Sequence, residues 1–137
     1  MAQRKHTFVR EKIKPNIRER WEKAIFPREI VPEIGAQGLL GMHLKGYGCA
    51  GKSAVAYGIA CMELEAVDPG LRTFVSVQGS LAMSASPKCG SEEQKQEWLP
   101  RMEKDEAIVC FGLTEPEAGS DPGSIKTFAR KERSDWC

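Results

Sequence analysis

Several features are scarce in this 137-residue sequence, and each scarcity excludes a class of protein. No run of about 18 apolar residues occurs, which excludes a membrane-spanning helix. The formal net charge is only +1 and no basic stripe with interleaved aromatic residues is present, so nucleic acid is not an indicated partner. Histidine is limited to His6 and His43, which stand apart in the sequence, and no metal site is predicted.

Cysteine is present without a pattern. No CxxC pair occurs, and the odd number argues against a closed disulfide framework, so we expect reduced thiols in a reducing compartment at Cys49, Cys61, Cys89, Cys110 and Cys137. The N-terminal stretch "MAQRKHTFVREKIK" lacks the apolar centre of a secretory signal. With Glu11 and few serines, it matches a mitochondrial presequence only weakly.

The first hundred residues carry a helical pattern. Between residues 8 and 25, apolar side chains recur at threes and fours, which predicts an amphipathic helix broken near Pro15, with a face of Phe8, Val9, Ile13, Ile17, Trp21 and Ala24. A second helix is predicted from Pro27 until glycines end it at residues 38 and 41. The run 53–67 combines larger apolar residues on one face with small residues on others, so we expect a helix buried on more than one side.

The next segments are also predicted to be helical. Asp68-Pro-Gly marks a turn, and the helix after it carries serine and threonine where a solvent-facing helix normally has charge, which indicates a cleft. Pro87 is expected to end that helix early. Ser91 and Gln94 form a capping box that starts a short helix through Trp98.

The character of the sequence changes near Asp105. The run "AIVCFGL" at 107–113 is continuously apolar and predicts a buried strand, and "IKTFA" at 125–129 predicts a second. The fold class is therefore mainly α. We expect a helical domain in residues 1–105, followed in residues 106–137 by the opening strands of an incomplete β domain.

One glycine-rich stretch satisfies a nucleotide-binding expression. "GYGCAGKS", from Gly46 to Ser53, fits GxxxxGK[ST], in which backbone amides cradle phosphates and the lysine reaches the terminal phosphate. The stretch before it is a poor strand, and no magnesium-binding aspartate ends a later one. A connection between helices, with Lys52 in solvent, is favoured over a nucleotide site.

A second stretch runs from a predicted strand into a small, polar and acidic loop: "CFGLTEPEAGSD", residues 110–121. A strand end exposes backbone amides, Thr114 adds a hydroxyl that both donates and accepts, and Gly119 permits an unusual backbone conformation. These residues indicate either a loop that binds an anion or a planar heterocycle, or an ordinary connecting turn.

The same stretch closely resembles the flavin-binding signature of the acyl-CoA dehydrogenases. "REIVPEIGAQGLLG", "KGYGCAG", "AVAYGIACMELEAVDPGLR", "SVQGSLAM" and "GSEEQKQEWLP" resemble successive parts of the glutaryl-CoA dehydrogenase branch, from about Arg10 to Ala129. The resemblance implies a helical N-terminal domain, a middle β domain and a C-terminal helical domain, with FAD and acyl-CoA between them. In that family "KGYGCAG" connects helices. Nucleotide binding is therefore the third hypothesis for the function, after the two described below.

The resemblance also implies an activity. A carboxylate base removes an α-proton while a hydride passes to FAD, and in the glutaryl branch the distal carboxylate then leaves as carbon dioxide to give crotonyl-CoA. Electron-transfer flavoprotein accepts the electrons, the enzyme is a homotetramer, and its location is the mitochondrial matrix in a eukaryote and otherwise the cytoplasm.

Site residues follow from the same resemblance. Those implied to bind the cofactor are Phe111, Gly112, Leu113, Thr114, Glu115, Pro116, Glu117, Ala118, Gly119 and Ser120. Those implied to bind the acyl-CoA are Glu65, Arg72, Thr73, Ser76 and Ser120, with Arg72 suited to a distal carboxylate through its planar fork of donors.

The family's catalytic glutamate lies in a C-terminal domain that has no counterpart in these 137 residues. Glu115 and Glu117 are interpreted as solvated loop carboxylates, so no catalytic residue is assigned and the chain alone is expected to be inactive. An alternative is a catalytically dead module that docks on the full-length enzyme through its helical face. Unpaired strand edges also predict partial folding beyond Asp105.

Overall fold

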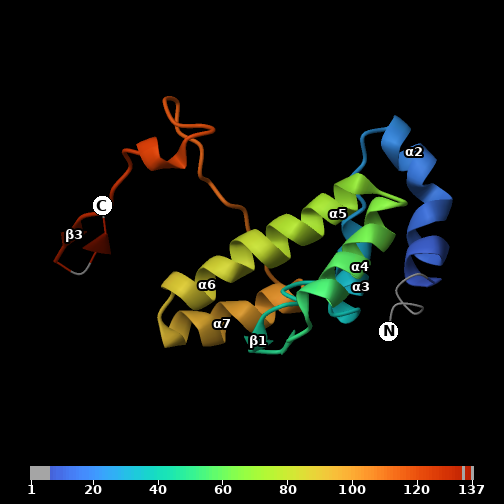
Figure 1. Ribbon diagram of the computed structural model, residues 1–137, viewed down its shortest axis with the longest axis horizontal. Coiled ribbons are helices and arrows are strands. Elements are labelled where there is room, and N and C mark those ends of the chain that lie inside the picture. Colours follow the sequence, from blue (N-terminus) through green and yellow to red (C-terminus); the bar gives the residue numbers. More distant parts are fainter. Residues whose placement is uncertain (1–6, 134, 137) are drawn as a thin grey trace.

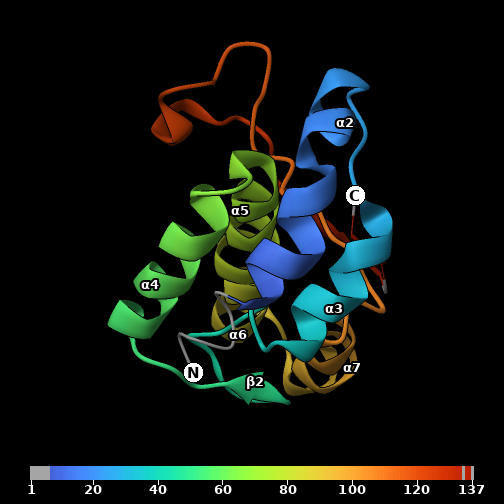
Figure 2. The ribbon, with the colours of Figure 1, turned by 90° about the vertical axis from the view of Figure 1, so that its right-hand side faces the viewer.

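A computed structural model describes residues 7–133 and 135–136. Helices pack side by side into one body, and the chain beyond α7 leaves that body as an arm (Figures 1 and 2). The elements are η1 (Val9–Ile13), η2 (Lys14–Asn16), α2 (Ile17–Glu22), η3 (Arg28–Ile30), α3 (Val31–Ala36), β1 (Lys45–Gly46), β2 (Cys49–Ala50), α4 (Ala54–Glu65), α5 (Pro69–Val75), η4 (Ser76–Ala82), α6 (Met83–Cys89), α7 (Glu92–Glu103), η5 (Pro122–Ser124), β3 (Lys131–Glu132) and β4 (Asp135–Trp136). The prediction of a mainly helical fold is confirmed.

The first helical segment is broken where proline predicts it. Pro15 lies in the 3₁₀ turn η2, between the π-helical turn η1 and α2. Val9 and Ile13 are buried, whereas Trp21 is 83% exposed. The prediction that Trp21 shares their buried face is wrong, because π and 3₁₀ turns have different numbers of residues per turn and shift the period across the break.

Helix α4 exposes the face on which we expected burial. Val55 and Met62 are 73% and 72% exposed, and the contact with the core is made instead by Ala60 and Leu64. Ala60 and Leu64 lie on the same side of α4, which leaves Val55 and Met62 on the outer side. The prediction of burial on several sides is therefore wrong.

Helices α5, η4 and α6 form one continuous rod (Figure 1). The Asp68 carboxylate begins it by accepting from the backbone amides of Gly70 and Leu71, at 2.8 and 3.2 Å. Pro87 does not end it early, because the last turn is still closed by the Gly90 amide on the Ser86 carbonyl, at 2.9 Å.

Helix α7 starts with the predicted capping box. The Ser91 hydroxyl accepts from the Gln94 amide, and the Gln94 side chain accepts from the Ser91 amide. The helix continues past Trp98 because Leu99 and Met102 remain buried against the core. The core itself is made of buried residues from the described helices and the 39–42 turn: Phe8, Val9, Ile13, Ile30, Ile34, Leu39, Leu40, Met42, Ala60, Leu64, Leu71, Val75, Met83, Leu99 and Met102.

Neither predicted strand forms. Residues 107–113 and 125–129 are irregular, and Phe111 and Leu113 are exposed. A strand needs a neighbour to pair with, and the described residues provide none along these runs. The strands observed late in the chain are the short antiparallel pair β3 and β4, in which Lys131 lies opposite Trp136.

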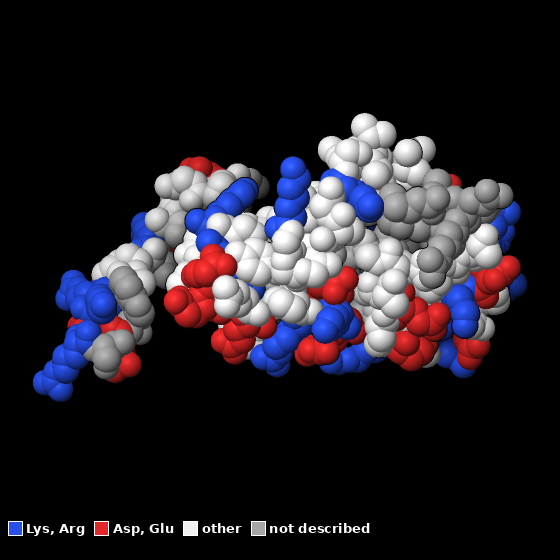
Figure 3. Space-filling view, turned by 90° about the horizontal axis from the view of Figure 1, so that it is seen from below, with Lys and Arg blue, Asp and Glu red and all other residues white. Residues whose placement is uncertain are grey.

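Charge is mixed on the face seen in Figure 3, where acidic and basic side chains are interspersed rather than gathered by sign. This distribution agrees with the near-zero net charge and offers no continuous field for a polyanion on that face. None of the helices within 7–133 is both long and apolar enough to cross a membrane.

Candidate functional site

Glu65 and Arg72 meet where the α4–α5 turn reverses the chain. The Arg72 Nε donates to the Glu65 carboxylate, and both side chains remain partly exposed. Asp68 sits between them in sequence and fixes the turn by capping α5. The Glu65 carboxylate raises the pKa of the Arg72 guanidinium, so Arg72 is a permanent cation held at one end of the helix pair.

Ser76 lies one turn beyond Arg72 and faces α4. Its hydroxyl is 3.1 Å from the Tyr57 hydroxyl, which also accepts a hydrogen bond from Ser80 at 2.9 Å. Sequence reasoning missed Tyr57 and Ser80. The sequence spacing carried a signal. Tyr57 and Glu65 are eight residues apart on α4, the same separation as Arg72 and Ser80 on the rod, so both pairs lie along one face of their helix.

These contacts define a polar seam between α4 and the rod, made of Tyr57, Cys61, Glu65, Arg72, Ser76 and Ser80. The seam explains the helix that carries hydroxyls in place of charges. Thr73, one residue after Arg72, is exposed and turned about 100° round the helix from it. The structure thus brings together Glu65, Arg72 and Ser76 but sets Thr73 apart.

His43 extends the row of polar contacts along the rod. Its Nε2 is 2.9 Å from the Ser84 hydroxyl, and its ring packs edge-on against Tyr57 at a centroid distance of 6.0 Å. No cluster of metal-binding side chains is found among residues 7–133 and 135–136. His43 is therefore a packing and hydrogen-bonding residue in this structure.

The loop 110–121 is closed by its own backbone. The amides of Glu115 and Ala118 each donate to the other residue's carbonyl, at 3.0 and 3.1 Å, and Ala118 is buried. The Glu115 carboxylate accepts from the amides of Lys126 and Thr127, both at 2.9 Å. These bonds, that from Lys126 first, lower the pKa of Glu115.

One of the two loop carboxylates differs from the prediction. Glu115 is not simply solvated, since it ties the turn to the residues that follow, whereas Glu117 is exposed and paired with Lys126. Both are occupied by partners within the chain. A carboxylate held by two backbone amides is a poor proton acceptor, which agrees with assigning neither residue as a base.

The residues before this turn present donors to solvent. Phe111, Gly112, Leu113 and Thr114 are exposed, so this segment carries a hydroxyl and several backbone amides at the surface. Amide and hydroxyl donors suit the carbonyl oxygens and ring nitrogen at the pyrimidine end of a flavin. Gly119 and Ser120 are also exposed, so the donor set fits the group that the sequence implies.

The stretch 46–53 does not have the geometry of a phosphate loop. Residues 45–46 and 49–50 pair with each other as a small hairpin, so the glycines form a turn between strands rather than a loop after one. The Ser53 hydroxyl is engaged in capping α4 through the Ala56 amide, at 3.2 Å. Lys52 is exposed, as predicted for a simple connection.

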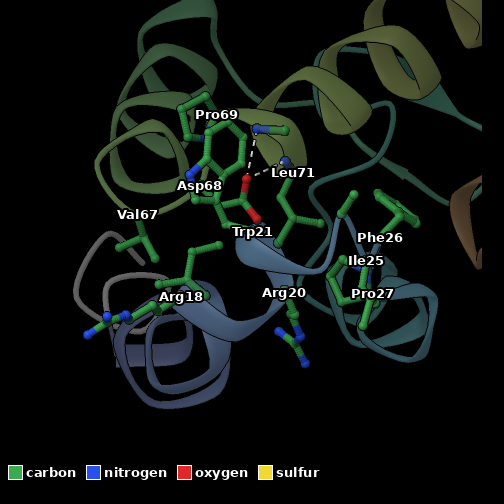
Figure 4. A pocket seen from close by; sticks show the side chains of 13 residues that line it. Arg18, Arg20, Trp21, Ile25, Phe26, Pro27, Val67, Asp68, Pro69 and Leu71 are labelled. Carbon is green, nitrogen blue, oxygen red and sulfur yellow. Dashed lines mark hydrogen bonds between the residues drawn. The ribbon is translucent and has the colours of Figure 1, made fainter.

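A cavity of about 660 Å³ lies between α2 and the α4–α5 turn. It is lined mostly by apolar side chains, including Trp21, Val67 and Leu71, while Arg18 and Arg20 extend outward from α2 (Figure 4). None of the predicted site residues lines it, and the polar Asp68 at its edge is occupied by the α5 cap. Volume alone therefore does not mark it as the site.

The family profile for the acyl-CoA dehydrogenase N-terminal domain matches residues 1–106. The chain belongs to the acyl-CoA dehydrogenase family. Members of this family are FAD-dependent oxidoreductases that act on acyl-CoA thioesters. The position of the match agrees with a chain whose helical part comes first.

Two curated relatives illustrate the match in sequence. The short-chain specific acyl-CoA dehydrogenase of Clostridium acetobutylicum is 39% identical over 123 residues, which cover 89% of this chain and 32% of that protein. The mitochondrial short-chain specific enzyme of Homo sapiens is 35% identical, over 94% of this chain and 32% of that protein. The chain thus spans about a third of the length of these relatives.

Solved structures match over nearly the whole chain. A glutaryl-CoA dehydrogenase from Mycobacterium smegmatis in complex with FADH2 is 56% identical with a TM-score of 0.92, covering 98% of this chain and 35% of that one. Butyryl-CoA dehydrogenase from Megasphaera elsdenii is 30% identical with a TM-score of 0.84, covering 96% and 36%. The fold is that of the corresponding third of these proteins.

Proposed function

We propose that the chain forms the N-terminal part of an FAD-dependent glutaryl-CoA dehydrogenase. The observation that carries this proposal is the polar seam, in which a fixed guanidinium, Arg72, lies one helical turn from the Ser76 hydroxyl. A distal carboxylate on the acyl chain needs such a cation, whereas a plain short acyl chain does not. The 56% identity to the Mycobacterium smegmatis enzyme supports the same choice over the short-chain relatives.

The residues divide into two groups of roles. Arg72 binds the distal carboxylate, Glu65 orients Arg72, and the Ser76 hydroxyl donates a further hydrogen bond to the acyl group. Thr73, although exposed here, would join them once the rest of the enzyme covers the helix pair. These residues hold the acyl end and perform no bond-breaking step.

The loop would hold the cofactor. FAD, when bound, supplies the hydride acceptor for the β-carbon of the acyl chain. Residues 111–120 bind it, with the Thr114 hydroxyl and neighbouring amides at the pyrimidine end and Ser120 shared between the cofactor and the acyl-CoA. The Glu115 turn keeps this donor set in one shape by binding residues 126–127.

No residue described here is assigned proton abstraction. Glu65 is paired with Arg72, and Glu115 and Glu117 are engaged in the loop. We therefore propose that the base comes from a part of the enzyme outside these 137 residues and that the chain alone does not dehydrogenate acyl-CoA. The domain boundary would lie near residue 105, just after α7 ends at Glu103.

The wider assignments belong to the same proposal. Electron-transfer flavoprotein would receive the electrons, and the full enzyme would be a homotetramer. The compartment would be the mitochondrial matrix in a eukaryote, where the human, rat and mouse relatives are mitochondrial by name, and the cytoplasm in a bacterium.

A second candidate is a module that lacks activity and docks on the full-length enzyme. It is favoured by one observation, the exposed apolar face of α4 formed by Val55, Ile59 and Met62, because such a face on an isolated domain normally meets a partner. Co-purification of the chain with a complete enzyme, abolished by Met62→Lys, would support this candidate. A monomeric chain that ignores the full enzyme would exclude it.

Flavin binding tests the cofactor assignment. FAD fluorescence, followed during titration with the 137-residue chain, is expected to show saturable binding that weakens about tenfold in Thr114→Val, the amount typical of one lost hydrogen bond. Thr114→Ser is the matched control, because it keeps the hydroxyl, and should bind like the unmodified chain. Equal binding by all three proteins would remove Thr114 from the site.

A further inference from the structure

Gln78 is the one polar or charged side chain that is fully buried among the described residues, with 1% of its surface exposed. Its Nε2 donates to the Ala107 carbonyl at 2.8 Å, and its Oε1 accepts from the Val109 amide at 3.0 Å. A buried carboxamide is costly unless both of its ends are satisfied, and here the chain satisfies both. The two partners also fix which end of the amide is oxygen.

The two bonds imitate the edge of a strand. Ala107 and Val109 are two residues apart, the spacing at which an extended segment presents a carbonyl and an amide to the same side. Residues 107–113 have no strand neighbour in the described part of the chain. The Gln78 side chain therefore supplies the pairing that a neighbouring strand would otherwise give to the start of this run.

The backbone that carries Gln78 is fixed on its other sides. Ser76 and Ser80 bind Tyr57 of α4, and Gly79 packs so closely on the 39–42 turn that a Cβ there would lie 2.8 Å from the Gly41 nitrogen. The π-helical turn η4 thus directs the Ser76 and Ser80 side chains toward α4 and the Gln78 side chain toward the arm, while Gly79 packs on the turn.

We propose that Gln78 is a positioning residue that sets the flavin loop in place relative to the acyl-binding seam. The inference rests on the proposed function. Arg72 and Ser76 lie on the same rod as Gln78, and Val109 lies two residues before Phe111, where the flavin-binding residues begin. One buried amide thereby links the helix that holds the acyl group to the loop that holds the cofactor, without touching either ligand.

The two hydrogen bonds of the Gln78 side chain, to Ala107 and from Val109, are called the Gln78 clasp below. Two substitutions distinguish this clasp from simple core packing. Gln78→Met keeps the length and the volume of the side chain but makes neither bond. Gln78→Glu places a carboxyl in the same site, where burial raises its pKa: at about pH 5 the protonated acid can both donate and accept, and its ionisation as the pH rises removes the donor and repels the Ala107 carbonyl. The controls are Gln96→Glu, the same change at an exposed position on α7, and the unmodified chain at low and high pH.

Amide hydrogen exchange in the full 137-residue chain reads the clasp directly. We expect the Val109 amide to be protected in the unmodified chain and to exchange about tenfold faster in Gln78→Met at low and high pH. In Gln78→Glu the faster exchange should appear at high pH and disappear at low pH. The amides of α7 should not change in the two Gln78 variants, and this shows that the effect is local.

FAD affinity is the second readout, measured by flavin fluorescence on the same proteins. We expect Gln78→Met to bind FAD about tenfold more weakly and Gln78→Glu to regain affinity at low pH relative to the Gln96→Glu control. A Val109 amide unprotected in the unmodified chain, or one unaffected by Gln78→Met, overturns the clasp. If one variant does not fold, the other decides, because Gln78→Glu at low pH retains both bonds.

The two readouts also separate this inference from the proposed function. If Val109 exchange accelerates while FAD affinity stays the same, Gln78 does not position the flavin loop, although the loop still binds FAD. If the unmodified chain shows no FAD binding, the proposed cofactor role of residues 111–120 fails, and the positioning role fails with it.

Discussion

Gly79 lies directly against the backbone of Gly41, so that a Cβ on Gly79 would come within 2.8 Å of the Gly41 nitrogen. This contact lets the rod of α5, η4 and α6 settle on the 39–42 turn, and both the seam and the Gln78 clasp depend on that placement. Backbone atoms cannot yield to a new methyl group as the end of a flexible side chain can.

Gly79→Ala should therefore destabilise the fold by about 1–3 kcal/mol, even though alanine is the better helix former. The free energy of unfolding from urea denaturation measures the change. Gly58→Ala is the matched control, since nothing lies within 4 Å of its Cβ on α4, and it should stabilise by about 0.5–1 kcal/mol. Equal effects of the two substitutions would show that η4 does not rest on Gly41.

Arg72→Lys keeps the charge but loses the planar fork. Because both partners of the ion pair are partly exposed, the free energy of unfolding should change by less than about 1 kcal/mol. Binding of glutaryl-CoA should weaken while binding of butyryl-CoA stays the same, as measured by calorimetry with the two ligands. An equal loss of affinity for both ligands would mean that Arg72 does not bind the distal carboxylate.

The Glu115 turn should loosen in acid. The amides of Lys126 and Thr127 lower the pKa of Glu115 in the folded chain. The contribution of this carboxylate to the stability of the turn is therefore fully present above the ordinary pKa of glutamate. It is lost as the pH falls through the lowered value, and the Lys126 and Thr127 amide resonances should shift together in that range. Glu115→Gln should abolish the titration, and amide shifts that persist in this variant would assign it to another group.

Cysteine reactivity should follow burial. Burial, and secondarily the charge of Glu103, raises the pKa of the Cys49 thiol to about 11, so little reactive thiolate exists at neutral pH. Exposed Cys89 and Cys110 should be alkylated by iodoacetamide first, with Cys49 slower by about a hundredfold, as read by peptide mass spectrometry. Glu103→Gln should modestly increase the rate at which Cys49 is alkylated. Equal labelling of Cys49 and Cys89 would contradict the burial of Cys49.

Local signals in the sequence were reliable where one residue determines the backbone. The break near Pro15, the turn capped by Asp68 and the Ser91–Gln94 capping box all appear as predicted. Each depends on chemistry within a few residues, a missing amide hydrogen or a side-chain acceptor at a helix start. The resemblance to the glutaryl branch implied that Glu65 and Arg72 belong to one site, and the structure pairs them across a short turn.

The failures concern residues whose environment is set by distant parts of the chain. The run 107–113 has strand composition, but pairing requires a neighbour, and the described chain offers only the Gln78 side chain. Likewise Val55 and Met62 have the right spacing for burial, yet Ala60 and Leu64 form the contact face of α4. Tyr57 was not predicted because its hydroxyl partners, Ser76 and Ser80, lie on another helix, although its spacing from Glu65 on α4 matches that from Arg72 to Ser80.

The central claim is that these residues supply the acyl and flavin contacts of a glutaryl-CoA dehydrogenase. A chimera, in which the chain replaces the matching third of the Mycobacterium smegmatis enzyme, tests it through the ratio of kcat/KM for glutaryl-CoA to that for butyryl-CoA. We predict an FAD-loaded chimera that forms crotonyl-CoA and prefers glutaryl-CoA, with the preference reduced at least tenfold by Arg72→Lys. A chimera that binds FAD but favours butyryl-CoA, or whose preference survives Arg72→Lys, would contradict the account.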